Sequence, residues 1–87
     1  MRTSYVRSDV AKLLLLGPAR EAAGTRHDEV DADTLETALV EAATRYGPAF
    51  KAILEVSQVW VNGSPAQRDA RVGPNDEIAV LPPVSGG

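Results

Sequence analysis

The chain has 87 residues, no cysteine and a formal net charge of −3 at pH 7, which fits one small acidic domain. The lack of cysteine excludes disulfides, thiolate metal sites and cysteine nucleophiles, and it favours a reducing cytoplasm. With His27 as the single histidine, we expect neither a metal site nor a bound cofactor. The basic residues are scattered and no apolar run reaches about 18 residues, so neither nucleic acid nor a membrane is an expected partner.

Residues 1–10 lack the apolar stretch of a signal peptide, and we expect them to form a flexible N-terminal extension. A central strand is predicted within residues 11–17, because four consecutive leucines suit a strand that is buried on both faces. Residues 19–25 predict a loop or a single helical turn that ends at a glycine. The polar stretch 26–32 has Val30 as its only large aliphatic residue, and it predicts an exposed edge strand.

The best-marked helix has its expected N-terminal cap at Asp33, which stands three residues before Glu36 in the spacing of a capping box. Gly47 and Pro48 are expected to end this helix. A short second helical segment is expected in residues 48–55. Apolar residues recur at helical intervals on one face of the first helix, namely Leu35, Ala38, Leu39, Ala42 and Tyr46.

Two further strands follow the helix. β-Branched and aromatic residues predict one in residues 57–62, where Asn62-Gly63 is a strong signal for a hairpin turn. A turn at residues 73–76 precedes the last strand, predicted at residues 77–81. Strands on both sides of one main helix, with the first and last strands paired in the middle of a small mixed sheet, predict an α+β, β-grasp (ubiquitin-like) domain over residues 11–81.

Side-chain alternation predicts which apolar residues face away from the helix. Trp60 lies between Val59 and Val61, so it points outward if both valines point inward; the alternative is that Trp60 packs in the core. We expect Leu16 and Leu81 to point outward beside Trp60, forming an exposed docking patch for a partner protein. The set expected to point inward is Leu13, Leu15, Ile78 and Val80.

Four segments and their spacing carry a family resemblance: KLLLLGPAREAAG at residues 12–24, the expected helix from Thr34, VNG at residues 61–63 and NDEIAVLPPVSGG at residues 75–87. Through them the chain resembles the MoaD/ThiS sulfur-carrier family, and among its members the small subunits of molybdopterin synthase. The resemblance covers residues 11–87. Asn75 stands where the family often has glycine, but asparagine tolerates positive φ, so the turn is expected to survive.

The resemblance implies a chemical role for the C-terminal tail, residues 82–87. An activating enzyme of the MoeB kind would adenylate the Gly87 carboxylate with ATP, and a sulfur donor would convert it to a thiocarboxylate. Gly87 would then donate sulfur to a pterin precursor inside a large subunit of the MoaE kind, in molybdenum cofactor biosynthesis. The resemblance implies that the AMP adduct and the thiocarboxylate would be transient and that the chain would act as a carrier subunit rather than as a catalyst.

The composition of the tail suits entry into a partner's channel. Gly86 has no Cβ that would clash, and Pro82 and Pro83 pre-set an extended backbone. Val84 and Ser85 complete the expected partner-binding segment, and the tail as a whole is expected to be flexible. Two alternatives stay open: a sulfur carrier for thiamine or cysteine biosynthesis, and a ubiquitin-like modifier that is conjugated to lysines through Gly87.

Overall fold

The structure is a computed structural model in which residues 10–83 are described. Within that range the chain forms five strands and three helices. In chain order they are β1 (Ala11–Leu15), α1 (Gly17–Ala23), β2 (His27–Val30), α2 (Leu35–Tyr46), α3 (Pro48–Glu55), β3 (Gln58–Val61), β4 (Ser64–Pro65) and β5 (Glu77–Leu81).

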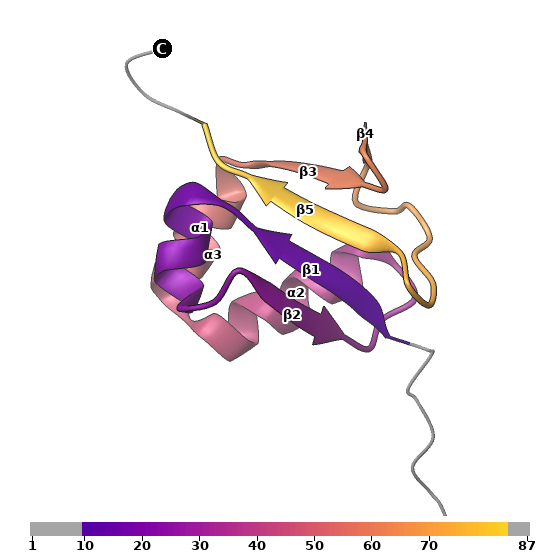
Figure 1. Ribbon diagram of the computed structural model, residues 1–87, viewed down its shortest axis with the longest axis horizontal. Helices are drawn as coiled ribbons and strands as arrows, with labels where there is room; N and C mark the ends of the chain where they lie inside the picture. Colours follow the sequence, from indigo (N-terminus) through magenta and orange to yellow (C-terminus); the bar gives the residue numbers. More distant parts are fainter. Residues whose placement is uncertain (1–9, 84–87) are drawn as a thin grey trace, which may run out of the picture.

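The strands form one mixed sheet in the order β2-β1-β5-β3-β4. β1 and β5 are parallel, and the other neighbouring pairs are antiparallel. The first and last strands therefore lie side by side in the middle of the sheet, and the polar strand β2 forms one edge (Figure 1). This topology confirms the predicted β-grasp fold.

α2 and α3 cover one face of the sheet, while α1 packs against α3 beside the ends of β1 and β5 (Figure 1). The hydrophobic core lies between the sheet and the helices, and burying each large side chain there stabilises the fold by about 1.5–3 kcal/mol. The inward orientation predicted for alternate strand residues is confirmed. The large core side chains are Leu13, Leu15, Val30, Val59, Ile78 and Val80 from the sheet, and Leu35, Leu39, Phe50 and Leu54 from the helices.

The N-terminal cap of α2 is Thr34, so the prediction of Asp33 was wrong by one residue. Thr34 has extended backbone angles, and its hydroxyl oxygen accepts a hydrogen bond from the Thr37 N–H at 3.2 Å. The neighbouring N–H groups of Leu35 and Glu36 donate to carbonyl oxygens of the 68–70 loop at 2.9 and 2.8 Å. Because this distant loop satisfies the first turn, the capping box expected from local spacing does not form.

α1 is longer than the expected loop or single turn. It begins with a proline in its first turn and ends at Gly24, whose φ of 78° is left-handed and whose N–H donates to the Arg20 carbonyl. Its one fully buried side chain is Ala19. The short length and the weak apolar pattern of this segment explain why the sequence alone left it open.

The two predicted turns are both present, and they are tied together. Asn62 has a φ of 52° in the β3–β4 hairpin, and Asn75 has a φ of 68° in the turn before β5. The Asn62 side-chain amide donates to Asp76 Oδ1 at 3.0 Å, while its Oδ1 accepts from the Glu77 N–H at 2.9 Å. The positive φ of Asn75 shows that asparagine is tolerated in the turn before β5, as expected. Within residues 10–83, no helix has the length and hydropathy needed to cross a bilayer.

Candidate functional site

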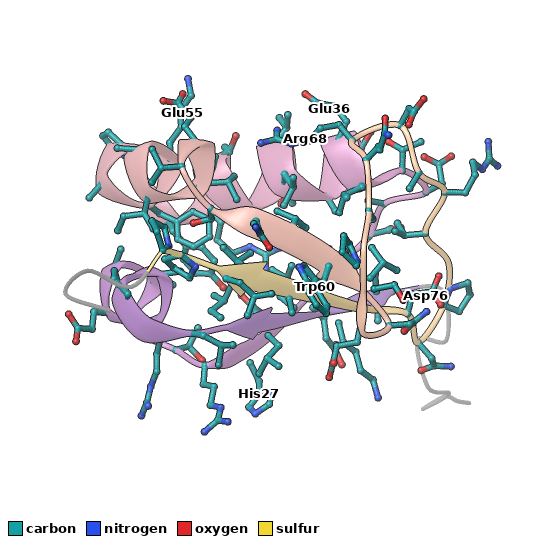
Figure 2. The ribbon with its side chains drawn as sticks, turned by 90° about the horizontal axis from the view of Figure 1, so that it is seen from above. His27, Glu36, Glu55, Trp60, Arg68 and Asp76 are labelled. Atoms are coloured by element: carbon teal, nitrogen blue, oxygen red, sulfur yellow. The ribbon has the colours of Figure 1, made fainter. Side chains whose placement is uncertain are left out.

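The face of the sheet away from α2 and α3 carries a row of apolar side chains. Leu14 lies opposite Ala79 in the β1–β5 register, and Ala79 lies opposite Trp60 in the β5–β3 register. Leu81 stands two residues after Ala79, so it shares the same face. Figure 2 shows His27, the partner of Leu14 in β2, on the side of the sheet away from the helices that carry Glu36 and Glu55.

We name this surface the open face and define it by Leu14, Leu16, Trp60, Ala79 and Leu81. All five are partly exposed, whereas the strand residues Leu13, Leu15, Val59, Ile78 and Val80, which alternate with them, are buried. Trp60 is therefore not in the core, and the alternative reading of its environment is wrong. Partner binding by Leu16, Trp60 and Leu81 stays a prediction.

The docking patch predicted from the sequence has fewer residues than the open face, and its residues are less exposed in the structure than we expected. Leu14 and Ala79 complete the patch. Strict side-chain alternation from Leu16 could have placed Leu14 on this face, whereas Ala79 could be placed there only from the strand register. The patch residues are only partly exposed, because they shield one another across neighbouring strands. Within the described residues, the large apolar side chains with the greatest exposure are Val40 and Val56, which lie on and after the helices.

The indole of Trp60 has a defined direction. Its Nε1 donates to Gln58 Oε1 at 3.2 Å, and Gln58 lies opposite Leu81 in the β3–β5 register. The ring is thus turned along β3 towards the row that contains Leu81. This contact links the centre of the open face to the end of β5.

The root of the tail lies at the same end of the sheet as α1. β1 and β5 are parallel, so Leu16 and Leu81 emerge from their strands at the same end (Figure 1). Leu16 is extended and its carbonyl begins α1 by accepting from the Ala19 N–H at 3.1 Å. Pro82 is half-buried and Pro83 is exposed. The predicted site residues Val84, Ser85, Gly86 and Gly87 lie outside the described residues, as do residues 1–9 of the expected extension.

The strongest electrostatic cluster lies elsewhere, where β2 meets the end of α2. Arg45 Nη1 lies 2.8 Å from Asp28 Oδ2, and the Tyr46 hydroxyl donates to the same oxygen. Burial alone raises the pKa of Asp28, but the hydrogen bonds from Tyr46, Arg45 and the Glu29 amide outweigh it and lower that pKa. Burial and the Asp28 carboxylate together raise the pKa of Tyr46 to about 12.

No group of three or more histidine, cysteine, aspartate or glutamate side chains in residues 10–83 is placed to hold a metal ion. The described residues offer features suited to recognition: an apolar face, one oriented indole and a proline-stiffened exit from the central strand.

Comparisons with known proteins agree with this geometry. Residues 13–87 match the ThiS family. The chain is 34% identical over 85 residues to a protein of Dictyostelium discoideum named molybdopterin synthase sulfur carrier subunit, covering 92% of this chain and 99% of that protein.

Two solved structures share the fold. SAMP1 from Haloferax volcanii superposes with a TM-score of 0.81 at 29% identity, over 90% of this chain and 99% of that one. Subunit 1 of the molybdopterin-converting factor of Helicobacter pylori, solved in complex with subunit 2, gives a TM-score of 0.66 at 22% identity, over 90% and 99% of the two chains. The second likeness is one of fold alone.

Proposed function

The chain belongs to the ThiS family, and from that premise we propose that it is the sulfur carrier, the small subunit, of a molybdopterin synthase. The observation that carries the proposal is the near full-length similarity to the Dictyostelium discoideum sulfur carrier subunit. The fold supports it, because β5, the strand that directly precedes the tail in sequence, lies at the centre of the sheet and contributes to an apolar face on which a partner can dock.

We propose that Gly87 is the reacting residue. Its carboxylate oxygen attacks the α-phosphorus of ATP, and pyrophosphate leaves. Hydrosulfide released by a sulfur donor then attacks the acyl carbon and displaces AMP, which leaves a thiocarboxylate on Gly87. The thiocarboxylate sulfur attacks the pterin precursor and displaces an oxygen substituent, and water then hydrolyses the resulting thioester, which leaves the sulfur on the precursor and a carboxylate on Gly87. A second charged carrier repeats these two steps to supply the second sulfur of the dithiolene.

Two partners follow from this proposal. An adenylating enzyme of the MoeB kind provides the ATP site, and a large subunit of the MoaE kind provides the pterin site. The Helicobacter pylori protein of the same fold was solved with its subunit 2, which is the kind of partner proposed for the open face here. We keep the cytoplasm as the proposed location, because adenylation consumes ATP.

The test changes the position of the carboxylate. One variant lacks Gly87, and another has one alanine added after Gly87; the added residue displaces the carboxylate by roughly 3.3–3.6 Å. Both should lose sulfur transfer in a synthase reconstituted with the large subunit, because a misplacement of even about 1 Å can cost on the order of a hundredfold in rate. Thermal unfolding serves as the control for folding. Full activity of the extended variant would contradict the proposal.

A second candidate, a protein modifier conjugated through Gly87, is favoured by the similarity to the small archaeal modifier protein SAMP1. Intact-mass analysis after co-expression with an activating enzyme separates the two. A sulfur carrier gains the mass of one sulfur in place of one oxygen, whereas a modifier appears in isopeptide adducts with lysines. A thiocarboxylate that forms but fails to convert the pterin precursor would indicate the alternative pathways, to thiamine or cysteine.

A further inference from the structure

The β2 edge of the sheet has a set of contacts that the sulfur-carrier role does not use. Among residues 10–83, β2 is the outermost strand on its side, and β1 is its only neighbour in the sheet. An edge strand usually presents unpaired N–H and C=O groups, which can pair with a strand of another molecule. Each outward-pointing backbone group of β2 is therefore a possible pairing group.

The register shows which groups point outward. The Leu15 N–H donates to the Arg26 carbonyl at 2.8 Å, so this pair is hydrogen-bonded across the antiparallel ladder. Hydrogen-bonded and non-hydrogen-bonded pairs alternate along such a ladder. The peptide groups of His27 and Glu29 consequently point away from β1, towards the open edge.

Side chains of the same molecule occupy three of these four outward groups. The Glu29 N–H donates to Asp28 Oδ1 at 2.8 Å, and the Glu29 carbonyl accepts from Arg45 Nη1 at 2.8 Å. The His27 carbonyl accepts from Thr25 Oγ1 at 2.9 Å. A strand that approached this edge would have to displace these bonds before it could form its own.

The two caps on Glu29 are held by the helix layer. Arg45 also binds Asp28 Oδ2 at 2.8 Å and Glu41 at 3.3 Å, so its guanidinium is fixed between β2 and α2. Tyr46 donates to Asp28, and its ring packs on buried Phe50 with the centroids 5.1 Å apart. The Asp28 carboxylate is thus connected through Tyr46 to the core, while the Arg45 side chain lies at the surface between β2 and α2.

We propose that the Asp28–Arg45 pair, here named the edge clamp, closes β2 against strand pairing with a second copy of this chain. A second copy is the relevant occupant, because two identical β2 strands can pair antiparallel about a two-fold axis and join two sheets into one. The edge contacts that carry this proposal do not depend on the sulfur-carrier function.

The test compares the oligomeric state of three full-length proteins by sedimentation velocity over a wide concentration range. Asp28→Ala/Arg45→Ala removes the edge clamp and keeps the net charge at −3, since one charge of each sign is lost. Thr34→Ala is the matched control, because it removes the cap at the other end of α2 and leaves the edge clamp intact. We expect association of the double variant alone, with a sedimentation coefficient that rises with concentration.

Amide hydrogen exchange gives a second reading on the unmodified protein. The Glu29 amide should exchange at least about tenfold more slowly than the His27 amide, which points to the same edge without a side-chain cap among residues 10–83. Arg45→Ala alone, which opens only the Glu29 carbonyl, replaces the double variant if that variant does not fold. The proposal would be overturned if the variant without the edge clamp stayed monomeric, or if Thr34→Ala associated to the same extent. It would also be overturned if the Glu29 amide exchanged as fast as the His27 amide.

Discussion

The Trp60 indole nitrogen lies 3.2 Å from Gln58 Oε1, and this bond turns the ring of the open face towards the end of β5. Both residues stand on β3, two positions apart, so their side chains leave the same face of the sheet. Trp60 is also the only tryptophan of the chain, so tryptophan fluorescence of the protein reports on the surroundings of this one side chain.

Trp60→Ala should weaken binding to the large synthase subunit by at least about 2 kcal/mol, or roughly 30-fold, because a central aromatic side chain is the usual anchor of an interface. Titration calorimetry with the large subunit measures this change. In the unmodified protein, Trp60 emission should shift when the large subunit is added. Val40→Ala is the control: this side chain is 54% exposed on α2, away from the open face, and its removal should leave the affinity unchanged.

The raised pKa of Tyr46 predicts a pH dependence of stability on the alkaline side. The folded pKa is about 12, against an ordinary value of 10, so the folded state holds the phenolic proton more tightly than the unfolded state. The resulting stabilisation is complete below pH 10 and is lost as the pH rises from about 10 to 12. Urea denaturation at both ends of this range should show a smaller loss for Tyr46→Phe than for the unmodified protein. Equal losses would mean that Tyr46 does not titrate as described.

The position of the α2 cap is tested by a pair of neighbouring substitutions. Thr34→Ala should lower the free energy of unfolding by about 1 kcal/mol, because the Thr37 N–H loses its acceptor. Asp33→Ala should change it by less than about 0.5 kcal/mol, since the first-turn N–H groups are satisfied by Thr34 and the 68–70 loop. Chemical denaturation of both variants measures these free energies of unfolding. A larger loss for Asp33→Ala than for Thr34→Ala would mean that Asp33 is the N-terminal cap.

The backbone conformation of Asn75 leads to a third prediction about the free energy of unfolding. Its φ of 68° is left-handed, so Asn75→Ala should cost about 1–2 kcal/mol, whereas Asn75→Gly should be close to neutral. Melting curves of the two variants provide the measurement. If alanine were tolerated as well as glycine, the turn before β5 would adopt a different conformation in solution.

Sequence patterns predicted the parts of this fold in which a residue's neighbours along the chain decide its environment. The leucine run gave a central strand, the polar stretch around Val30 gave an edge, and Asn62-Gly63 gave a hairpin. The α2 cap was missed because the carbonyl groups that satisfy its first turn come from the distant residues Arg68 and Ala70.

The same distinction applies to the candidate site. The outward positions of Trp60 and Leu81 follow from alternation within one strand. Ala79 joined the open face only through the β1–β5–β3 register, because a small residue carries no pattern of its own. The bond from Trp60 to Gln58 depends on side-chain directions that no spacing rule specifies.

The central position of β5 has a consequence for the timing of folding. Leu13 pairs with Ile78, so the middle of the sheet joins two segments from opposite ends of the chain. Such contacts pay a large loop-closure entropy and slow the search for the native state. During synthesis the leucines of β1 emerge first and must wait, uncovered, until residues 77–81 arrive to complete the sheet. Because Ile78 and Val80 of β5 are themselves part of the core, the end of β5 can lie beside Leu16 only when the pairing that closes the core has formed.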